Sequence, residues 1–114
     1  MKYLLTVLVR LLFLFLLTCF LNSCSDTAEV PVNKVHTVEI RTMKFHPSGL
    51  IVKKGDTVLF VNKDFVVHDI TEAESKRWNS MPLETDKSYR LVVTKSEGFY
   101  CSLHPVMKGN IIAE

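Results

Sequence analysis

The sequence predicts an all-β domain folded as an antiparallel β-sandwich, and three observations support this prediction. From residue 35 onward the apolar residues form short runs, as expected for strands with one buried face. In several of these runs apolar and polar residues alternate. Gly, Pro and Asp separate the runs at short intervals, which is typical of strands joined by tight turns.

The first predicted strand covers residues 35–42, where Val38 and Ile40 share one face and Glu39 and Arg41 share the other. Successive side chains of a strand point to opposite faces, so this alternation predicts a strand with one side in the core. A Lys-Gly-Asp sequence at residues 54–56 predicts a turn. The further predicted strands are residues 50–52, 57–61, 66–70, 89–93, 99–101 and 110–113.

Residues 72–86 interrupt this pattern, because they are rich in polar residues and show no strand alternation. Trp78, Met81 and Pro82 are interspersed among them. We interpret the segment as an irregular excursion between strands, with a short helix inside it as an alternative.

The N-terminal segment has the character of a targeting sequence. Lys2 and Arg10 precede an apolar run at residues 11–21, which is too short for a comfortable membrane span and is typical of a secretory signal. The sequence Leu-Asn-Ser-Cys that follows resembles the lipobox of bacterial lipoproteins, which implies cleavage before Cys24 and a lipid on its sulfur. An ordinary signal peptide and an uncleaved anchor helix are the alternatives.

This interpretation divides the chain into a lipoprotein signal peptide at residues 1–23, a lipidated Cys and tether at 24–34, and a domain at 35–114. The whole chain has 14 Lys+Arg and 12 Asp+Glu, and cleavage removes Lys2 and Arg10. The mature chain then has 14 − 2 = 12 basic and 12 acidic residues, so its net charge is zero. Nucleic-acid binding has no support, and the length suits one monomeric domain. Cys101 is the one thiol left inside the domain, so no internal disulfide is expected.

A thiolate, an imidazole and a thioether recur every three residues near the end of the chain, at Cys101, His104 and Met107. A tightly turning loop aims such positions at a common centre. Two imidazoles and one thiolate in a plane with a weak axial thioether form a blue-copper site, whereas Met is a poor zinc ligand. The loop supplies one His, and the best candidate for the second imidazole is His68, which lies in an apolar run.

Each donor also has a purely structural interpretation. Cys101 could be a buried thiol, Met107 a core residue, His104 a surface residue before a Pro, and His68 a core histidine with its hydrogen bonds satisfied. His36 and His46 gain nothing from the copper hypothesis, and we expect both to be solvated. Two other methionines, Met43 and Met81, are expected to pack in the core or to form an apolar rim around the site.

Two stretches of the sequence resemble the cupredoxins, the type 1 blue copper proteins of the plastocyanin and azurin superfamily. One is Met-Lys-Phe at residues 43–45 together with the Gly-Asp-Thr-Val block at 55–58, and the other is Cys-x-x-His-Pro-x-Met-x-Gly at 101–109. The second stretch resembles amicyanin most closely, a subfamily with two residues between the His and the Met. The resemblance implies a Greek-key β-sandwich with one copper held by His68, Cys101, His104 and Met107.

The resemblance also implies roles for the neighbours of the ligands. In the family, an Asn after the first His usually ties that strand to the residue that follows the Cys. Asp69 takes its place here, opposite Ser102. The Asp69 carboxylate can accept the Ser102 hydroxyl proton, so the connection between the strand and the loop can be kept. The negative charge of this carboxylate is expected to lower the reduction potential of the copper. In the family the edge of the loop His is the port for electrons. Around His104 we therefore expect an apolar patch for docking a partner, made by Leu103, Pro105 and Val106.

The function expected from these features is the transfer of single electrons between exported redox partners by a protein that is not itself an enzyme. The partner would be a cytochrome, a reductase or a dehydrogenase. The alternative is a periplasmic copper-delivery lipoprotein, and an adhesion or structural lipoprotein is a third possibility. We expect the mature protein on the periplasmic side of a bacterial membrane. Ser25 after the lipidated Cys favours the outer membrane.

Overall fold

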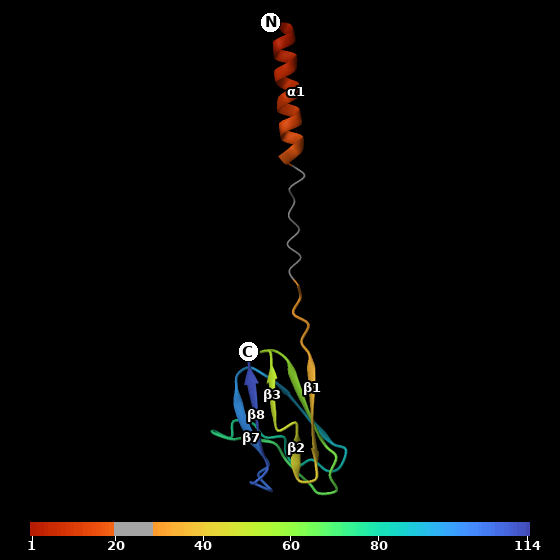
Figure 1. Cartoon of the computed structure of the whole chain (residues 1–114), viewed down its shortest axis with the longest axis vertical. Coiled ribbons are helices and arrows are strands. Elements are labelled where there is room, and N and C mark those ends of the chain that lie inside the picture. The colour runs from red at the N-terminus through yellow and green to blue at the C-terminus, as the bar shows by residue number, and fades with distance from the viewer. Residues whose placement is uncertain (20–28) are drawn as a thin grey trace. The chain divides into compact units, whose positions relative to one another are not determined.

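The computed structural model describes residues 1–19 and 29–114 (Figure 1). These residues form two separate compact units, Met1–Pro31 and Val32–Glu114. The first unit contains helix α1 (Lys2–Cys19). Within the described part of the chain, no helix combines the length and the apolar character that crossing a membrane requires. The predicted lipidation site, Cys24, lies outside the described residues.

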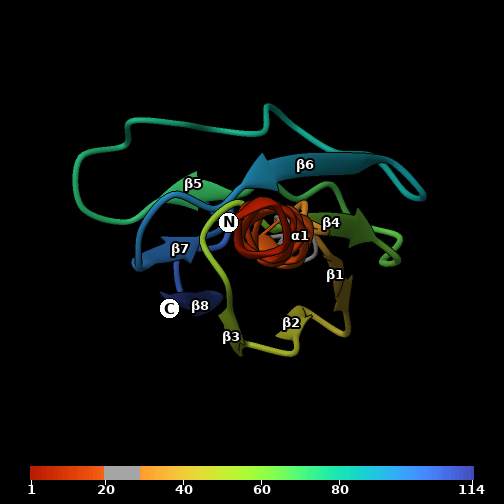
Figure 2. The same ribbon diagram turned by 90° about the horizontal axis from the view of Figure 1, so that it is seen from above.

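The second unit is a sandwich of two four-stranded sheets, which confirms the predicted all-β fold (Figures 1 and 2). The first sheet has the order β2-β1-β4-β6, and the second has the order β3-β8-β7-β5. Most neighbouring strands are antiparallel, but β1 pairs with β4 and β3 pairs with β8 in parallel. The strands are β1 (Val35–Arg41), β2 (Lys44–His46), β3 (Gly49–Val52), β4 (Thr57–Asn62), β5 (Thr71–Glu72), β6 (Ser88–Val92), β7 (Glu97–Tyr100) and β8 (Lys108–Ala113).

The core lies between the two sheets, and the alternation predicted for the first strand is confirmed. Val38 and Ile40 on β1 are buried, whereas Arg41 is exposed. Three aromatic rings meet at the centre, where Phe99 contacts Phe45 at a centroid distance of 4.9 Å and Phe60 at 5.0 Å, both edge to face. All buried apolar residues of this cluster belong to the unit Val32–Glu114, so this unit has the core that a domain needs to fold by itself.

The strand predicted at residues 66–70 is wrong, because this segment makes only one isolated bridge, between His68 and Leu83. The chain crosses here from β4 in the first sheet to β5 in the second. Asn62, at the end of β4, directs the crossing: its side-chain amide donates to the carbonyls of Val66 at 2.8 Å and Leu83 at 2.9 Å. The Val66 carbonyl is therefore bonded to a side chain, and the Leu83 carbonyl is shared between Asn62 and the N–H of His68, so the segment forms an isolated bridge although its apolar composition suits a strand.

Residues 73–87, all described, contain no helix, so the irregular excursion is confirmed and the short helix is not. The excursion is organised around the buried carboxylate of Glu72. This carboxylate accepts hydrogen bonds from the Ser75 hydroxyl at 2.6 Å and from the backbone N–H groups of Glu74, Ser75 and Arg77. The Ser75 hydroxyl contributes most to lowering the pKa of Glu72, which falls to about 2.

The strand directions give the sandwich two distinct ends. Strands β1, β4 and β7 run toward the end that contains residues 63–68 and the loop 101–107, called here the His68 end. Strands β3, β6 and β8 run toward the opposite end, where the chain enters β1, called here the Val35 end. Figure 1 shows the loop between β7 and β8 and the C-terminus at opposite ends of the sandwich.

Candidate metal centre

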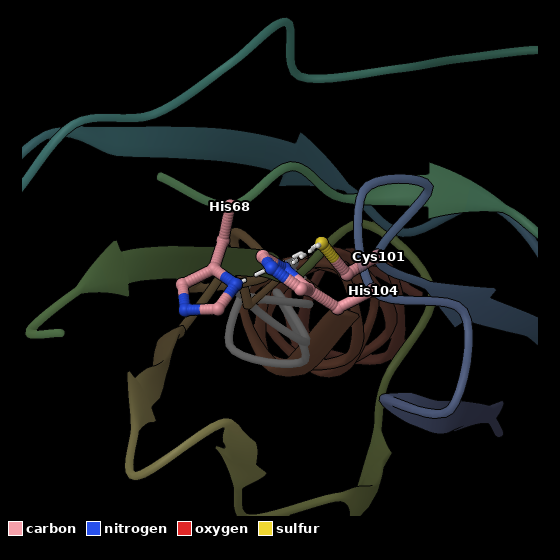
Figure 3. Close-up of side chains that lie close together, drawn as sticks. All are labelled: His68, Cys101 and His104. Carbon is pink, nitrogen blue, oxygen red and sulfur yellow. Dashed lines mark hydrogen bonds between the residues drawn. The ribbon is translucent and has the colours of Figure 1, made fainter. Parts of the chain in front are cut away.

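Three potential metal donors converge at the His68 end. The Cys101 sulfur lies 3.8 Å from Nδ1 of His68 and 3.7 Å from Nδ1 of His104 (Figure 3). The donor atoms of the three residues all lie within 4.8 Å of one another. Nitrogen and sulfur donors bound at about 2.0 and 2.3 Å to one ion, at a trigonal angle, lie about 3.7 Å apart. The separations in the structure therefore suit one shared ion.

The loop that follows β7 holds Cys101, His104 and Met107 through three backbone hydrogen bonds. The N–H of His104 donates to the carbonyl of Cys101 at 3.2 Å, and the N–H of Met107 donates to that of His104 at 2.9 Å. The N–H of Cys101 donates to the carbonyl of Met107 at 3.1 Å and closes the ring. Each bond joins two of the predicted donors, so the three-residue spacing reflects two successive tight turns. The side chains of Cys101 and Met107 are buried, and that of His104 is half-buried.

His68 reaches the site from the crossing segment between the sheets. Its backbone pairs with Leu83, donating at 3.2 Å and accepting at 2.7 Å, and its side chain is completely buried. Its Nδ1 faces the Cys101 sulfur, as Figure 3 shows, while Nε2 lies 3.0 Å from a carboxylate oxygen of Asp64. A donor hydrogen bond from Nε2 fixes the tautomer in which Nδ1 carries the free lone pair.

Asp64 is a site residue that sequence reasoning missed. Its carboxylate also accepts the backbone N–H groups of Thr42 at 3.0 Å and Met43 at 2.9 Å. The Met43 bond is the main cause that lowers the pKa of Asp64, with further contributions from His68 and Thr42. Thr42 and Met43 form the turn between β1 and β2 and both have a positive φ. No sequence motif marks this contact, since its partners lie more than twenty residues apart.

The sequence places Asp69 opposite Ser102, and the structure brings these two residues together. One carboxylate oxygen of Asp69 accepts the Ser102 N–H at 2.6 Å, and the other accepts the Ser102 hydroxyl. The backbone N–H of Asp69 donates to the Cys101 sulfur at 3.4 Å. Asp69 thus connects the crossing segment to the Cys101 loop at two points, next to two of the donor residues.

Apolar side chains surround this site on the surface. Leu103, Pro105 and Val106 are all exposed, Val106 to 89%. A second apolar group was missed by the sequence prediction, because it fell partly in the wrongly assigned strand: Phe65 is 98% exposed, and Val66 and Val67 are exposed beside it. Met43 and Met81 are exposed as well, so neither belongs to the core.

His36 and His46 lie outside the site, as expected, but neither is simply solvated. His36 is half-buried, and its Nε2 lies 2.8 Å from a carboxylate oxygen of Asp56. His46 is half-buried too, and its Nε2 has no hydrogen-bond partner among the described residues. The burial of both rings follows from their positions on β1 and β2, and of these two strands the sequence pattern did not predict β2.

The chemistry of the donors decides which metal they fit. Two neutral imidazoles and one thiolate, with a buried thioether in the same loop, form the donor set of a type 1 copper site. Zinc sites instead draw four donors from Cys, His and carboxylates. The residues present therefore fit one type 1 copper.

Comparisons with known proteins agree with this assignment. No family model matches the chain. The amicyanin of Paracoccus denitrificans is 29% identical over 84 residues, which cover 68% of this chain and 63% of that protein. The amicyanin of Paracoccus versutus is 27% identical over 93 residues, or 76% of this chain and 70% of that protein. The chain thus spans less than two-thirds of the first relative's length.

Solved structures show the same likeness. A reduced amicyanin mutant superimposes with a TM-score of 0.66 and 28% identity, covering 76% of this chain and 88% of that protein. The copper-containing nitrite reductase of Thermus scotoductus gives a TM-score of 0.63 and 29% identity, covering 68% of this chain but 22% of the reductase. A purple cupredoxin of Nitrosopumilus maritimus shares the fold, with a TM-score of 0.62. The donor set, the two-sheet fold and these likenesses agree: the chain has the fold of the cupredoxins and is similar to amicyanin.

Proposed function

We propose that this protein carries single electrons between exported redox proteins, using one copper held by His68, Cys101, His104 and Met107. The observation that carries the proposal is the convergence of the His68, Cys101 and His104 donors, with sulfur-to-nitrogen separations of 3.7 and 3.8 Å. These donors lie at an end of the sandwich that exposes apolar loops. We propose a carrier and not an enzyme.

Bound copper supplies a one-electron couple between Cu(II) and Cu(I). The chain supplies a fixed set of donors that changes little between the two states. Three backbone hydrogen bonds hold the Cys101 loop, Asp69 ties that loop to the crossing segment, and Asp64 orients His68. Because these contacts restrain the donors whichever redox state is present, little rearrangement opposes electron transfer.

The partner is proposed to dock on the apolar loops around His104. This imidazole is half-buried, so one edge of its ring is accessible, while Leu103, Pro105 and Val106 provide apolar contacts. The exposed side chain of Phe65 extends this surface on the neighbouring loop. With a mature net charge of zero, the complex depends more on a small apolar contact than on electrostatic steering, which suits a short-lived encounter with a cytochrome, reductase or dehydrogenase.

We place the mature protein outside the cytoplasm, on the periplasmic side of a bacterial membrane. This location rests on the signal-like residues 1–23 and on the lipobox-like sequence before Cys24. Ser25 favours the outer membrane. A mass spectrum of the mature protein tests the anchor, because a diacylglyceryl group on Cys24 would add its mass to a chain that begins at that residue.

Copper delivery without electron transfer is the second candidate function. It is less well supported, because Cys101 is completely buried and Met107 is 3% exposed. Delivery proteins need donors that an acceptor can reach, whereas buried donors favour retention of the metal. The rate at which a Cu(I) chelator removes the metal separates the two functions: rapid release would favour delivery.

The visible spectrum of residues 25–114 after addition of Cu(II) tests the site itself. We expect an intense band at roughly 600 nm from charge transfer between Cys101 and copper. The band should disappear in Cys101→Ser and weaken or shift in His104→Gln, whereas the matched control His46→Gln should keep it. A folded protein without the band would show that the donors do not bind copper together. A reversible one-electron wave in voltammetry would complete the case for an electron carrier.

A further inference from the structure

The Val35 end of the sandwich carries a cluster of lysines, defined here as the basic end: Lys34, Lys53, Lys54 and Lys95. All four side chains are exposed. They come from three separate segments, namely the residue before β1, the turn between β3 and β4, and the turn between β6 and β7. The sequence shows no run of basic residues here, so the cluster arises from the fold.

Backbone contacts bring these segments together. The buried carboxylate of Asp56 accepts the N–H of Lys34 at 2.9 Å and the N–H of Lys53 at 3.2 Å. The N–H of Gly55, next to Lys54, donates to the carbonyl of Val93 at 2.8 Å, two residues before Lys95. The lysines are therefore attached to one small, well-connected surface.

Acidic groups offset the charge of this surface only in part. Asp56 is buried and already accepts a hydrogen bond from His36, and Glu97 pairs with Arg77. Glu114 is the exposed acid at this end of the sandwich among the described residues, and its backbone carbonyl accepts the N–H of Lys54 at 3.1 Å. The sequence of the tether contains two further acids, Asp26 and Glu29. None of the four lysines forms an ion pair with a described residue.

Basic residues elsewhere on the domain are partly paired. Arg41 lies 3.4 Å from Glu39, Lys63 lies 2.7 Å from Asp86, and Arg77 pairs with Glu97. Lys44, Lys76, Lys87, Arg90 and Lys108 also form no ion pair with a described residue, but the basic end joins four unpaired lysines on one surface, at the end opposite the copper donors.

We propose that the basic end binds the anionic headgroups of the membrane to which the protein is anchored. The inference rests on the proposed lipid anchor at Cys24, because the tether enters the domain at this same end. The ten residues 25–34 span at most about 35 Å, so the anchor confines the basic end near the headgroups. This confinement raises the effective concentration of a contact that would be weak by itself.

The consequence is an orientation for the whole domain. Each lysine near an anionic surface contributes a favourable electrostatic free energy, which decays within a Debye length. All four lysines therefore contribute only when this end of the domain faces the lipid. The copper donors and the apolar loops of the His68 end then point away from the membrane, toward partners in solution. The competing interpretation is that an acidic protein docks at the basic end. The charge of the lysines does not favour such a protein over anionic lipid, and a vesicle-binding experiment distinguishes the two.

The test is co-sedimentation of copper-loaded residues 25–114, which lack the lipid, with vesicles. We expect binding to vesicles containing phosphatidylglycerol at low salt, none to pure phosphatidylcholine, and release by added salt. Replacing the basic-end lysines by Gln should weaken binding at least about tenfold. The matched control replaces four exposed lysines elsewhere and should bind nearly as wild type, although its net charge changes equally. The basic-end variant combines Lys34→Gln, Lys53→Gln, Lys54→Gln and Lys95→Gln. The control variant combines Lys44→Gln, Lys76→Gln, Lys87→Gln and Lys108→Gln.

Equal loss in both variants would show that net charge alone governs binding and would overturn the proposal. So would the absence of wild-type binding to anionic vesicles, or binding of an acidic redox protein at the basic end in its place. The band at roughly 600 nm, recorded on the same samples, reports the folded copper site independently. A failure of membrane binding is thereby distinguished from a failure of the proposed copper function.

Discussion

Replacing Asp64 by Asn tests whether a carboxylate behind His68 prepares the site for its metal. The Asp64 carboxylate accepts three N–H groups, from Thr42, Met43 and His68, at 2.9 to 3.0 Å. Asn provides one oxygen acceptor and an NH2 donor, so at least one of the three N–H groups loses its acceptor. The substitution also removes the negative charge that favours donation from His68.

The expected size of the effect follows from the burial of this side chain, which is 16% exposed. A hydrogen bond to a charged group contributes about 1.5–3 kcal/mol, and slight exposure places this case near the middle, at about 2 kcal/mol. The melting temperature of the metal-free protein should fall by roughly 8–16 °C. Loss of an outer hydrogen bond to a metal-binding His typically costs about 10–100-fold in metal affinity, and we expect a loss in this range.

Denaturant unfolding of the metal-free protein and competitive copper titration measure the two quantities. Asp86→Asn is the matched control, because Asp86 pairs with Lys63 at 2.7 Å but is 70% exposed, and such a pair contributes about 0–1 kcal/mol. Asp64→Glu should recover part of the copper affinity. If Asp64→Asn loses no more stability than Asp86→Asn and binds copper as tightly as wild type, the reasoning is refuted.

Three further predictions concern the contact between Asp69 and Ser102, the core, and the irregular excursion that follows β5. Asp69→Asn should raise the reduction potential by removing negative charge beside the copper, and an unchanged or lower potential in voltammetry would contradict this. Gly109→Ala should destabilise the fold by about 1–3 kcal/mol in thermal unfolding, because its Cβ would lie 2.3 Å from the Phe99 ring and 2.6 Å from the backbone carbonyl oxygen of Ser48. Wild-type stability would mean that both neighbours shift without a cost in stability. The pKa of Glu72 is depressed from 4.5 to about 2, mainly by the Ser75 hydroxyl, so its stabilising effect is complete above about 4.5 and is lost as pH falls toward about 2. In Glu72→Gln the free energy of unfolding should depend less on pH in this range. An unchanged dependence of stability on pH would contradict the prediction.

The donors and the main strands could be predicted from the sequence because both depend on short-range patterns. The three-residue spacing of Cys101, His104 and Met107 is local, and so is the alternation around Val38 and Ile40. His68 lies far from them in the chain. It could still be predicted, because the loop supplies only one imidazole to a site that needs two, and an unpaired imidazole inside an apolar run is costly.

The missed features depend on contacts between distant segments. Residues 66–70 have the composition of a strand, yet the Asn62 side chain bonds the carbonyl of Val66 and the segment makes one isolated bridge. The same error concealed the exposure of Phe65 and its neighbours beside the site. The Asp64 contacts join a loop to the turn between β1 and β2, and no local rule reports such a pairing.

The closed ring of backbone bonds in the loop 101–107 has a consequence for how this site can evolve. Both ends of the loop continue into β7 and β8, which pair in a fixed register, so the loop cannot slide to absorb a change in length. Inserting or deleting one residue between Cys101 and Met107 would displace several donors at once, whereas exchanging the exposed side chains at 103, 105 or 106 leaves the donors in place. In related sequences we therefore expect variation in the exposed side chains of the surface proposed for partner docking, and a constant length of the segment 101–107.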